Sequence, residues 1–193
     1  MNTKASLREQ VFLKRKSLSE KERLESGESL LKLWKSIEGL YRTKKIALYW
    51  PVNGEISTNT LISYLLKDGS KCFLPIIAQD KENKILEFAP FEVDSPITNN
   101  RFNISEPSTA ARVDLNELDI IFLPCVCFDS RGNRIGMGGG FYDKTLDQLS
   151  SNQKPQLILL AYDFQKVQCC FPENHDIKAD ACLTPNKFLK FKE

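Results

Sequence analysis

Glycines are concentrated in one short segment of the chain, at residues 129–144. Five of the nine glycines lie within nine consecutive residues: Gly132, Gly136, Gly138, Gly139 and Gly140. A glycine loses more conformational freedom on folding than any other residue, so such a cluster is unfavourable unless the backbone needs φ > 0 or approaches a ligand closely. An ordinary turn needs only about one or two glycines. The density therefore favours a binding loop over a structural turn.

The segments on either side of the glycines indicate what the loop binds. An apolar run at 119–128 predicts a strand before it, and the pattern at 141–149 predicts a helix after it. In the order strand, glycine loop and helix start, free backbone N–H groups face the loop and favour an anion. We therefore expect this loop to bind a phosphate group, and we favour a nucleotide as the ligand that contains it.

Known nucleotide motifs do not describe this loop. A Walker A motif has a glycine directly before Lys-Ser/Thr, whereas three residues separate Gly140 from Lys144. The dinucleotide fingerprint is also absent, because the third glycine and an acidic ribose partner are missing. Asp143 either favours the dipole of the predicted helix or, beside phosphates, holds Mg²⁺. Arg134 either reaches a phosphate or remains a solvated loop arginine.

Three further places in the chain carry residues that could bind ligands. Glu55 follows the predicted strand 45–50, at the edge where open α/β sheets bind ligands. Lys4 and Arg8 are one helical turn apart and could clamp an anion, although a solvated helix face is the ordinary alternative. Near the other end, the carboxylates of Asp176 and Asp180 are possible metal ligands, although such clusters are usually solvated.

Length and composition restrict the class of protein. A chain of 193 residues suits a single domain with one core, and 41% hydrophobic with 27% charged residues argues against disorder. The formal net charge of +2 is too small for a typical nucleic-acid-binding protein. No apolar run approaches the roughly 20 residues that span a bilayer, and the N-terminal residues lack the apolar stretch of a signal peptide. We therefore expect a cytoplasmic protein that binds neither nucleic acid nor membrane.

Cysteine and histidine usage argues against a cysteine-ligated zinc site and against a Ser-His-Asp catalytic triad. The spacing of the six cysteines does not match a Cys-x₂-Cys zinc site, so buried free thiols are expected. His175 is the only histidine, so a Ser-His-Asp triad has one possible base and no supporting signature.

Alternating strand and helix patterns predict the fold class. Helical spacing covers the first 18 residues, and further helices are predicted at 19–39 and 61–69. Strands are predicted at 45–50, 72–77 with a hairpin partner at 85–89, 119–128, 157–161 and 181–183. The aperiodic stretch 92–113 is expected to be a long loop on the surface or over a site. The predicted fold is a single α/β domain over 1–193, a three-layer α/β/α arrangement with a mainly parallel sheet.

The segment from Leu123 to Asp143 resembles the signature of the 5-formyltetrahydrofolate cyclo-ligase family, also called methenyltetrahydrofolate synthetase. The resemblance extends over nearly the whole chain in matching order. Its weaker parts are Lys4 with Arg8, Gly54-Glu55-Ile56, Ile104 with Glu106 and Pro107, and His175-Asp176.

The resemblance implies an enzyme that uses ATP and Mg²⁺ to cyclise the reduced folate 5-formyltetrahydrofolate to 5,10-methenyltetrahydrofolate, releasing ADP and phosphate. We expect it to be a monomer. The residues that the resemblance assigns to ATP are Lys4, Ala5, Ser6, Leu7, Arg8, Arg134, Ile135, Gly136, Met137, Gly138, Gly139, Gly140, Phe141 and Tyr142.

The resemblance also implies roles toward the folate and the metal. Folate contacts are expected from Arg8, Trp50, Glu55, Met137, Gly138, Gly139, Gly140 and Phe141. Asp143 and Asp176 are the implied magnesium ligands, and Arg134 and Tyr142 are the expected catalytic residues. Some family members carry lysine where Gly139 stands and tyrosine where Phe141 stands, so this chain lacks that ammonium and that hydroxyl. Many members have arginine where Lys144 stands.

Two other functions stay open at this point. One is an enzyme on the same scaffold that acts on a different formylated or phosphorylated small molecule. The other is a nucleic-acid-binding protein that uses the basic residues Lys14, Arg15 and Lys16, which the near-neutral charge balance disfavours.

Overall fold

The fold is described from a computed structural model, which covers all residues except 1–2, 42–44, 79, 81, 151–153 and 192–193. Seven strands form one sheet in the order β11-β10-β9-β6-β1-β2-β3. Their bounds are β1 Lys45–Ala47, β2 Lys71–Ile77, β3 Leu86–Phe91, β6 Ile120–Pro124, β9 Gln156–Leu160, β10 Ala181–Leu183 and β11 Phe188–Lys190.

The five inner strands of this sheet run parallel, and the two edge strands run antiparallel to their neighbours. Strands β6 and β9 lie in the middle and are almost continuously buried. Their apolar runs, without polar alternation, are typical of parallel strands that are covered on both faces. The predicted α/β class with a mainly parallel sheet is confirmed.

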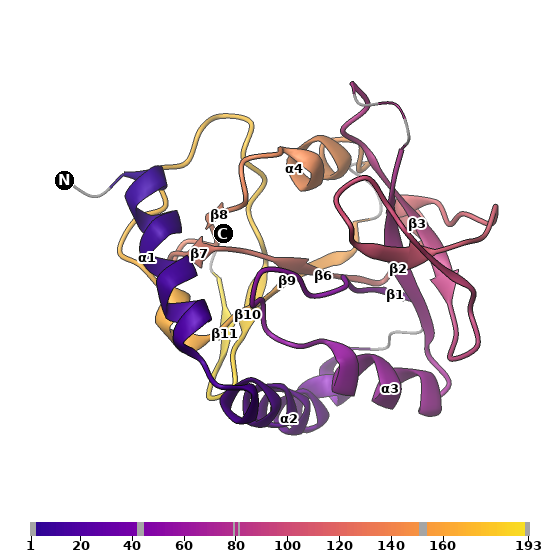
Figure 1. The fold of residues 1–193 in the computed structure, drawn as a ribbon, viewed down its shortest axis with the longest axis horizontal. Helices are drawn as coiled ribbons and strands as arrows, with labels where there is room; N and C mark the ends of the chain where they lie inside the picture. The colour runs from indigo at the N-terminus through magenta and orange to yellow at the C-terminus, as the bar shows by residue number, and fades with distance from the viewer. Residues whose placement is uncertain (1–2, 42–44, 79, 81, 151–153, 192–193) are drawn as a thin grey trace.

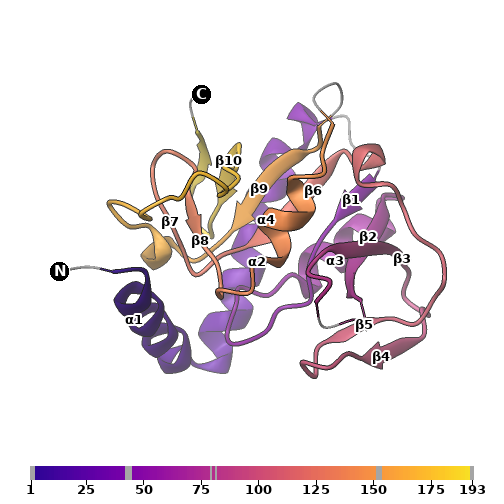
Figure 2. The same ribbon diagram turned by 90° about the horizontal axis from the view of Figure 1, so that it is seen from above.

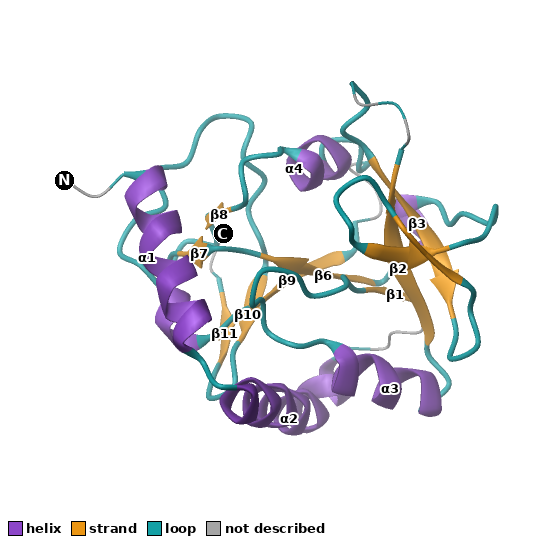
Figure 3. Ribbon diagram, in the orientation of Figure 1, coloured by secondary structure: helices purple, strands orange, loops and turns teal. Residues whose placement is uncertain are grey.

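Helices cover both faces of the sheet (Figures 1 and 3). The helices are α1 Lys4–Ser17, α2 Glu20–Ile37, α3 Asn59–Lys67 and α4 Phe141–Leu146, with 3₁₀ turns η1 Glu38–Leu40, η2 Leu115–Glu117 and η3 Asp163–Gln165. On one face α2 and α3 bury Trp34 and Leu61 against Phe122 and its neighbours. On the other face the short α4 contributes Leu146 to a second core cluster. Among the described residues, no helix is both long and apolar enough to cross a membrane.

The first helix packs beside the end of the sheet and brings the N-terminal region to the glycine segment. Thr3 and Ser6 form a capping box that starts α1. The helix buries Leu7 and Val11 against Val126, Cys127 and Ile135. A second capping box, Ser19 with Glu22, starts α2 as the sequence predicts. Packing of α1 therefore places the side chains at its start next to the residues that follow β6.

Several predicted elements differ from the structure. The strand predicted at 119–128 is two strands, because β6 ends at Pro124 and Cys127–Phe128 (β7) pairs with Arg134–Ile135 (β8) in a separate ribbon. Proline has no N–H to continue a ladder, and the chain turns away there. The helix predicted to reach 149 ends at Leu146, and the strand predicted at 45–50 ends at Ala47.

Long-range pairing accounts for two elements that the sequence does not predict. The stretch 92–113 contains a small antiparallel ribbon, formed by β4 (Ile97–Asn99) and β5 (Ser105–Pro107), so the expectation of a plain loop was wrong. The edge strand β11 pairs with β10. Figure 2 shows α1 and the β4–β5 ribbon on opposite sides of the segment that joins β8 to α4.

Candidate active site

A cavity of about 1060 Å³ lies at the carboxyl edge of the parallel strands. Residues that follow β1 and β6, such as Trp50 and Cys125, form part of its wall. The glycine segment 136–140, the start of α1, the tip of the β4–β5 ribbon and the loop 173–176 supply further parts of the wall. Ligands of open α/β sheets bind at this edge, because the loops that follow the strands are free to vary there.

Backbone conformation explains part of the glycine cluster. Gly132, Gly138 and Gly140 have φ values of +81°, +94° and +73°. At Gly132 a Cβ would lie 2.4 Å from the carbonyl oxygen of Ala179, so this glycine is needed for packing. At Gly136 and Gly140 a Cβ would meet no other atom within 4 Å. Gly136 and Gly140 therefore present backbone to open space. A Cβ at Gly139 would instead lie 2.8 Å from the Phe141 ring, and a Cβ at Gly138 would lie 3.8 Å from the Arg8 guanidinium.

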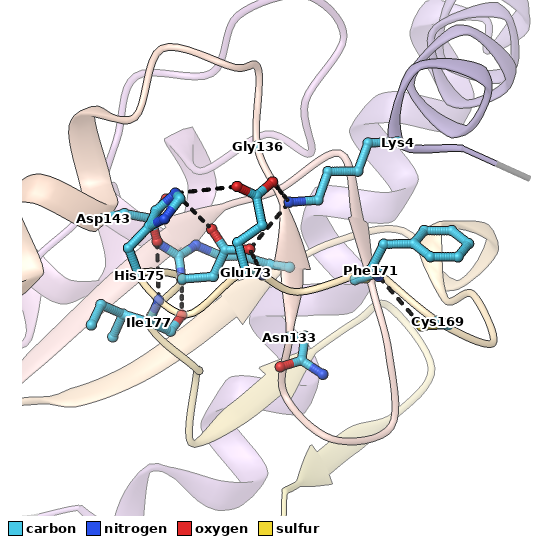
Figure 4. A network of polar contacts seen from close by, with 12 residues as sticks. Lys4, Asn133, Gly136, Asp143, Cys169, Phe171, Glu173, His175 and Ile177 are labelled. Atoms are coloured by element: carbon cyan, nitrogen blue, oxygen red, sulfur yellow. Dashed lines mark hydrogen bonds and ion pairs between the residues drawn. The ribbon is translucent and has the colours of Figure 1, made fainter.

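The start of α1 reaches the loop that precedes β10, as Figure 4 shows. The ammonium of Lys4 lies 2.7 Å from Oε1 of Glu173 and 3.3 Å from Oδ2 of Asp176. His175 Nε2 lies 3.7 Å from Oδ1 of Asp176. One turn further along α1, Arg8 Nε donates a hydrogen bond of 2.8 Å to the carbonyl oxygen of Gly136.

These contacts favour the charged forms of the groups involved. Burial acts against the charge on Lys4, but hydrogen bonds to Glu173 and Asp176 outweigh it and raise the pKa of the ammonium. Burial also acts against the Asp176 carboxylate, yet the backbone N–H of Glu173 and the Lys4 ammonium together lower its pKa. For Glu173, the hydrogen bond from Lys4 lowers the pKa of the carboxyl.

A second ion pair lies beside the first. The side chain of Arg134 is only 4% exposed. Its guanidinium donates from Nη2 to Oδ1 of Asp143 at 2.7 Å and from Nη1 to the carbonyl oxygen of Ile177. The backbone N–H of Ile177 donates to the same Asp143 oxygen at 3.2 Å. This triangle joins β8, α4 and the loop after Asp176 (Figure 4).

Asp129 stabilises the turn that positions Arg134 in this triangle. Its fully buried carboxylate accepts hydrogen bonds from the backbone N–H groups of Arg131, Asn133 and Cys170, and from the Asn133 amide. Burial raises the pKa of Asp129, but these hydrogen bonds outweigh it and lower the pKa overall. Sequence reasoning did not single out Asp129, and the only available signal was its place at the start of the glycine segment.

The other end of the cavity, called the dry end below because its polar side chains are almost fully buried, carries the carboxyl group of Glu55. Glu55 is 9% exposed, and its Oε2 accepts a hydrogen bond of 3.1 Å from the backbone N–H of Val52. Burial raises the pKa of Glu55 to about 7. Burial, with Glu55 nearby, also raises the pKa values of Tyr49 and Tyr142 far above the ordinary value, so both hydroxyls stay neutral.

Aromatic residues line the mouth between the two ends. Trp50 contacts Phe91 edge to face, with ring centroids 6.0 Å apart. Phe102, at the tip of the β4–β5 ribbon, contacts Phe141 in the same way at 6.0 Å. Glu106 holds this tip in place, because its Oε2 accepts from the backbone N–H of Ile77 and the side chain of Asn100. Phe102 is a cavity residue that sequence reasoning missed.

Most of the predicted site residues come together around this one cavity. Lining side chains or backbone come from Lys4, Arg8, Trp50, Glu55, Arg134, Ile135, Gly136, Met137, Gly138, Gly139, Gly140, Phe141, Tyr142, Asp143 and Asp176. Ala5, Ser6 and Leu7 are not among the lining residues. Ser6 belongs to the capping box of α1 and Leu7 is buried in a core cluster. The ligand contacts expected of these three stay a prediction.

The two predicted magnesium ligands line the same cavity but do not form a closed metal cage. In the described part of the chain, no group of three or more His, Cys, Asp or Glu side chains is arranged to hold a metal. Mg²⁺ commonly takes only one or two carboxylates and completes its shell with phosphate and water. Both hydrogen bonds that described residues donate to the Asp143 carboxylate use Oδ1. The assignment of Asp143 and Asp176 to Mg²⁺ stays a prediction, and it requires an ion that also takes ligands from phosphate and water.

Comparison with known proteins gives a consistent assignment. The sequence profile of the 5-formyltetrahydrofolate cyclo-ligase family matches residues 1–185. A Haemophilus influenzae protein named 5-formyltetrahydrofolate cyclo-ligase is 41% identical over 138 residues, which cover 70% of this chain and 73% of that protein. An Escherichia coli K12 protein of the same name is 32% identical over 176 residues, with coverage of 90% and 96%.

A solved structure extends the match to the fold. The Aquifex aeolicus 5,10-methenyltetrahydrofolate synthetase aligns with a TM-score of 0.83 and 30% identity, covering 98% of this chain and 93% of that one. Fold and cavity define an α/β enzyme scaffold with its site at the carboxyl edge of the sheet, and the relatives are ligases. The chain belongs to the 5-formyltetrahydrofolate cyclo-ligase family. The predicted family and enzyme class are confirmed, and the relatives' names support cyclo-ligase activity.

Proposed function

We propose that this protein catalyses the ATP-dependent, Mg²⁺-assisted cyclisation of 5-formyltetrahydrofolate to 5,10-methenyltetrahydrofolate, with release of ADP and phosphate. One observation carries the proposal beyond family membership. A single cavity joins a charged, glycine-rich end to a dry end with a buried carboxyl group. The reaction needs both ligands in one site, because phosphate passes from one to the other.

The charged end supports binding of the polyphosphate. The backbone at Gly136 and Gly140 faces open space, and Lys4, Arg8 and Arg134 line the same end. Because the members of this family are ligases, they imply a nucleotide co-substrate. We propose that this nucleotide is ATP. Mg²⁺ between phosphate oxygens, Asp143 and Asp176 would neutralise charge on the polyphosphate.

The dry end supports binding of the folate. A pterin ring presents N–H donors along one edge, and the Glu55 carboxyl at the strand end can accept them. The apolar walls, among them Trp50 and Phe141, offer faces for the rings of the substrate. A hydrogen bond to a charged partner contributes about 1.5–3 kcal/mol, so Glu55 is expected to contribute strongly to folate affinity.

The chemistry requires positioning more than a protein nucleophile. The formyl oxygen is a poor leaving group, and it attacks the γ-phosphorus of ATP while ADP departs. N10 of the folate then attacks the iminophosphate carbon. The five-membered ring closes as N10 loses its proton and phosphate leaves. Phosphoryl transfer of this kind depends on alignment and on charge stabilisation.

Two residues are proposed to act directly on the transferred group. Arg134, held by Asp143 and Ile177, would donate hydrogen bonds to the γ-phosphate as it moves. Tyr142, whose burial raises its pKa, would act as a neutral hydrogen-bond donor and not as a base. No group of the chain needs to form a covalent bond with the substrate.

One spectrophotometric assay tests the proposal. Purified protein with 5-formyltetrahydrofolate, ATP and Mg²⁺ should form the absorbing methenyl product, with one ADP released per product. Omission of ATP, or chelation of Mg²⁺, should abolish the signal. A protein that hydrolyses ATP with another formylated molecule, and leaves 5-formyltetrahydrofolate unchanged, would instead be a paralogue on the same scaffold.

A further inference from the structure

The contact between Lys4 and two carboxylates has a consequence for which form of the polyphosphate can bind. Lys4 comes from α1, whereas Glu173 and Asp176 come from the loop before β10 (Figure 4). The ammonium is 2.7 Å from Glu173 and 3.3 Å from Asp176, so it is already neutralised before any ligand enters. Its side chain is only 24% exposed, which ties it to these partners more firmly than a free surface lysine.

The charges around this end of the cavity cancel. Among the residues that the structure describes, the ionised side chains that line it are the cations Lys4, Arg8 and Arg134 and the anions Asp143, Glu173 and Asp176. Three positive and three negative groups leave no formal excess, and His175 is counted as neutral. A polyphosphate that carries several negative charges would therefore enter a site with no net positive charge. Each carboxylate would also repel its oxygens at close range.

Not all of the three carboxylates are needed to hold the structure together. Asp143 is tied to Arg134 and Ile177, and Asp176 accepts from the backbone N–H of Glu173 at 2.9 Å. Glu173 differs, because its side chain is 59% exposed and its contacts are with Lys4 at 2.7 Å and, more distantly, His175 at 3.9 Å. Its position is easier to explain by what it does to Lys4 than by packing.

We propose that Glu173 is a specificity residue, which makes the site favour metal-bound over metal-free polyphosphate by holding the ammonium of Lys4. A bound divalent cation would compensate the carboxylates and leave Lys4 free to contact phosphate. A metal-free polyphosphate would have to compete with Glu173 for Lys4 and would face the uncompensated carboxylates. Metal and polyphosphate then strengthen each other's binding, as reciprocal linkage requires. This inference rests on the proposed nucleotide site.

Calorimetric titration with β,γ-imido-ATP tests the inference without turnover. The measured quantity is the dissociation constant in EDTA divided by the dissociation constant in excess Mg²⁺. In Glu173→Gln this ratio should fall about threefold to fivefold below the wild-type ratio, the range expected for an exposed ion pair, chiefly through tighter metal-free binding. Glu28→Gln is the matched control, because Glu28 is exposed on α2 and does not line the cavity.

A second variant tests the route through Lys4. In a Lys4→Met background, Glu173→Gln should change the ratio much less than it does in the wild type. An equal change in both backgrounds would overturn the role assigned to the Lys4 contact, and an unchanged ratio in Glu173→Gln alone would overturn the whole inference. Absence of analogue binding to the wild-type protein under both conditions would instead contradict the proposed nucleotide site.

Discussion

The two ends of the cavity differ in whether their carboxyl groups are paired with cationic side chains. At the charged end the carboxylates of Asp143 and Asp176 each lie within 3.3 Å of a cationic side chain. At the dry end, the hydrogen bond that the structure gives to the Glu55 side chain comes from the neutral backbone N–H of Val52. The pKa of Asp176 is accordingly lowered, whereas that of Glu55 is raised to about 7.

This difference shows what each end is suited to bind. Paired, partly exposed ions can exchange partners with a metal-bound polyphosphate at little loss, because the metal would replace the cationic partners of the carboxylates and the phosphate would replace the anionic partners of the cations. A buried carboxyl that none of the described cations contacts, although Arg15 acts on it from further away, is destabilising until a ligand supplies hydrogen-bond donors. We therefore propose that the charged end binds phosphate with a metal and that the dry end binds a flat ligand with N–H groups.

The largest expected effect concerns Arg134 at the charged end. Arg134→Gln keeps a donor for the carbonyl of Ile177 but removes the charge, so turnover should fall roughly 100-fold to 1,000-fold, as for loss of one preorganised donor to a transition state. Steady-state kinetics of methenyl formation would measure it. Arg131→Gln is the control, because this arginine is exposed on the same segment and does not line the cavity. Equal rates for the two variants would mean that Arg134 does not take part in the reaction.

The next effect concerns the stability of the dry end. The pKa of Glu55 is about 7 in the folded chain against an ordinary value of 4.5, so the folded state holds this proton more tightly. The stability of the wild-type protein should therefore decrease as pH rises from about 4.5 to about 7, and the loss should be complete above that pH. Glu55→Gln should raise the free energy of unfolding by up to about 3 kcal/mol at pH 8, and by much less at pH 5.

Urea unfolding of both proteins at the two pH values measures this difference. A gain that is the same at pH 5 and pH 8 would mean that Glu55 does not titrate in this range. A loss of stability at pH 8 would mean that the carboxylate has a stabilising partner that the described contacts do not include.

A smaller effect is expected from the proposed metal ligand Asp143. An amide is a weaker ligand than a carboxylate for a hard cation, so Asp143→Asn should raise the Mg²⁺ concentration for half-maximal rate about tenfold. Asp147→Asn is the matched control, because Asp147 is exposed just after the same helix. An unchanged magnesium titration in Asp143→Asn would leave this residue as the partner of Arg134 only.

The smallest effect concerns the glycine segment itself. Gly140 has φ of +73°, so Gly140→Ala should lower stability by about 1–2 kcal/mol and place a methyl group where phosphate approaches. Gly136→Ala lacks the positive φ and should leave stability unchanged while still weakening nucleotide binding. Thermal melts and nucleotide titrations of both variants separate strain from ligand contact. Full nucleotide affinity in both variants would mean that the glycine segment has a purely structural role.

Local patterns made much of this architecture predictable. The capping box at Ser19 and Glu22, the apolar strands and the glycine segment all depend on residues close in sequence. The same is true of Lys4 and Arg8, whose spacing already suggested one helix face. The family resemblance then indicated which of these local features belong to one site.

Features that depend on distant partners were not predictable from spacing. Asp129 matters because Cys170 and Asn133 converge on it, and Phe102 matters because the β4–β5 ribbon folds over the cavity. The end of β6 at Pro124 was not predictable for the same reason. It depends on the pairing of β7 with β8 in a separate ribbon, outside the main sheet. Glu173 lies three residues before Asp176 in the sequence, and only its contact with Lys4 distinguishes it.

The most direct test of the two-ended site is calorimetric titration of two variants with two ligands. Glu55→Gln should weaken 5-formyltetrahydrofolate binding roughly tenfold to 100-fold and leave the Mg²⁺ complex of β,γ-imido-ATP near its wild-type affinity. Lys4→Met should show the reverse pattern, because its ammonium lies at the charged end. Equal loss of both ligands in both variants would mean that the cavity acts as one undivided site, and would contradict the assignment of folate and nucleotide to separate ends.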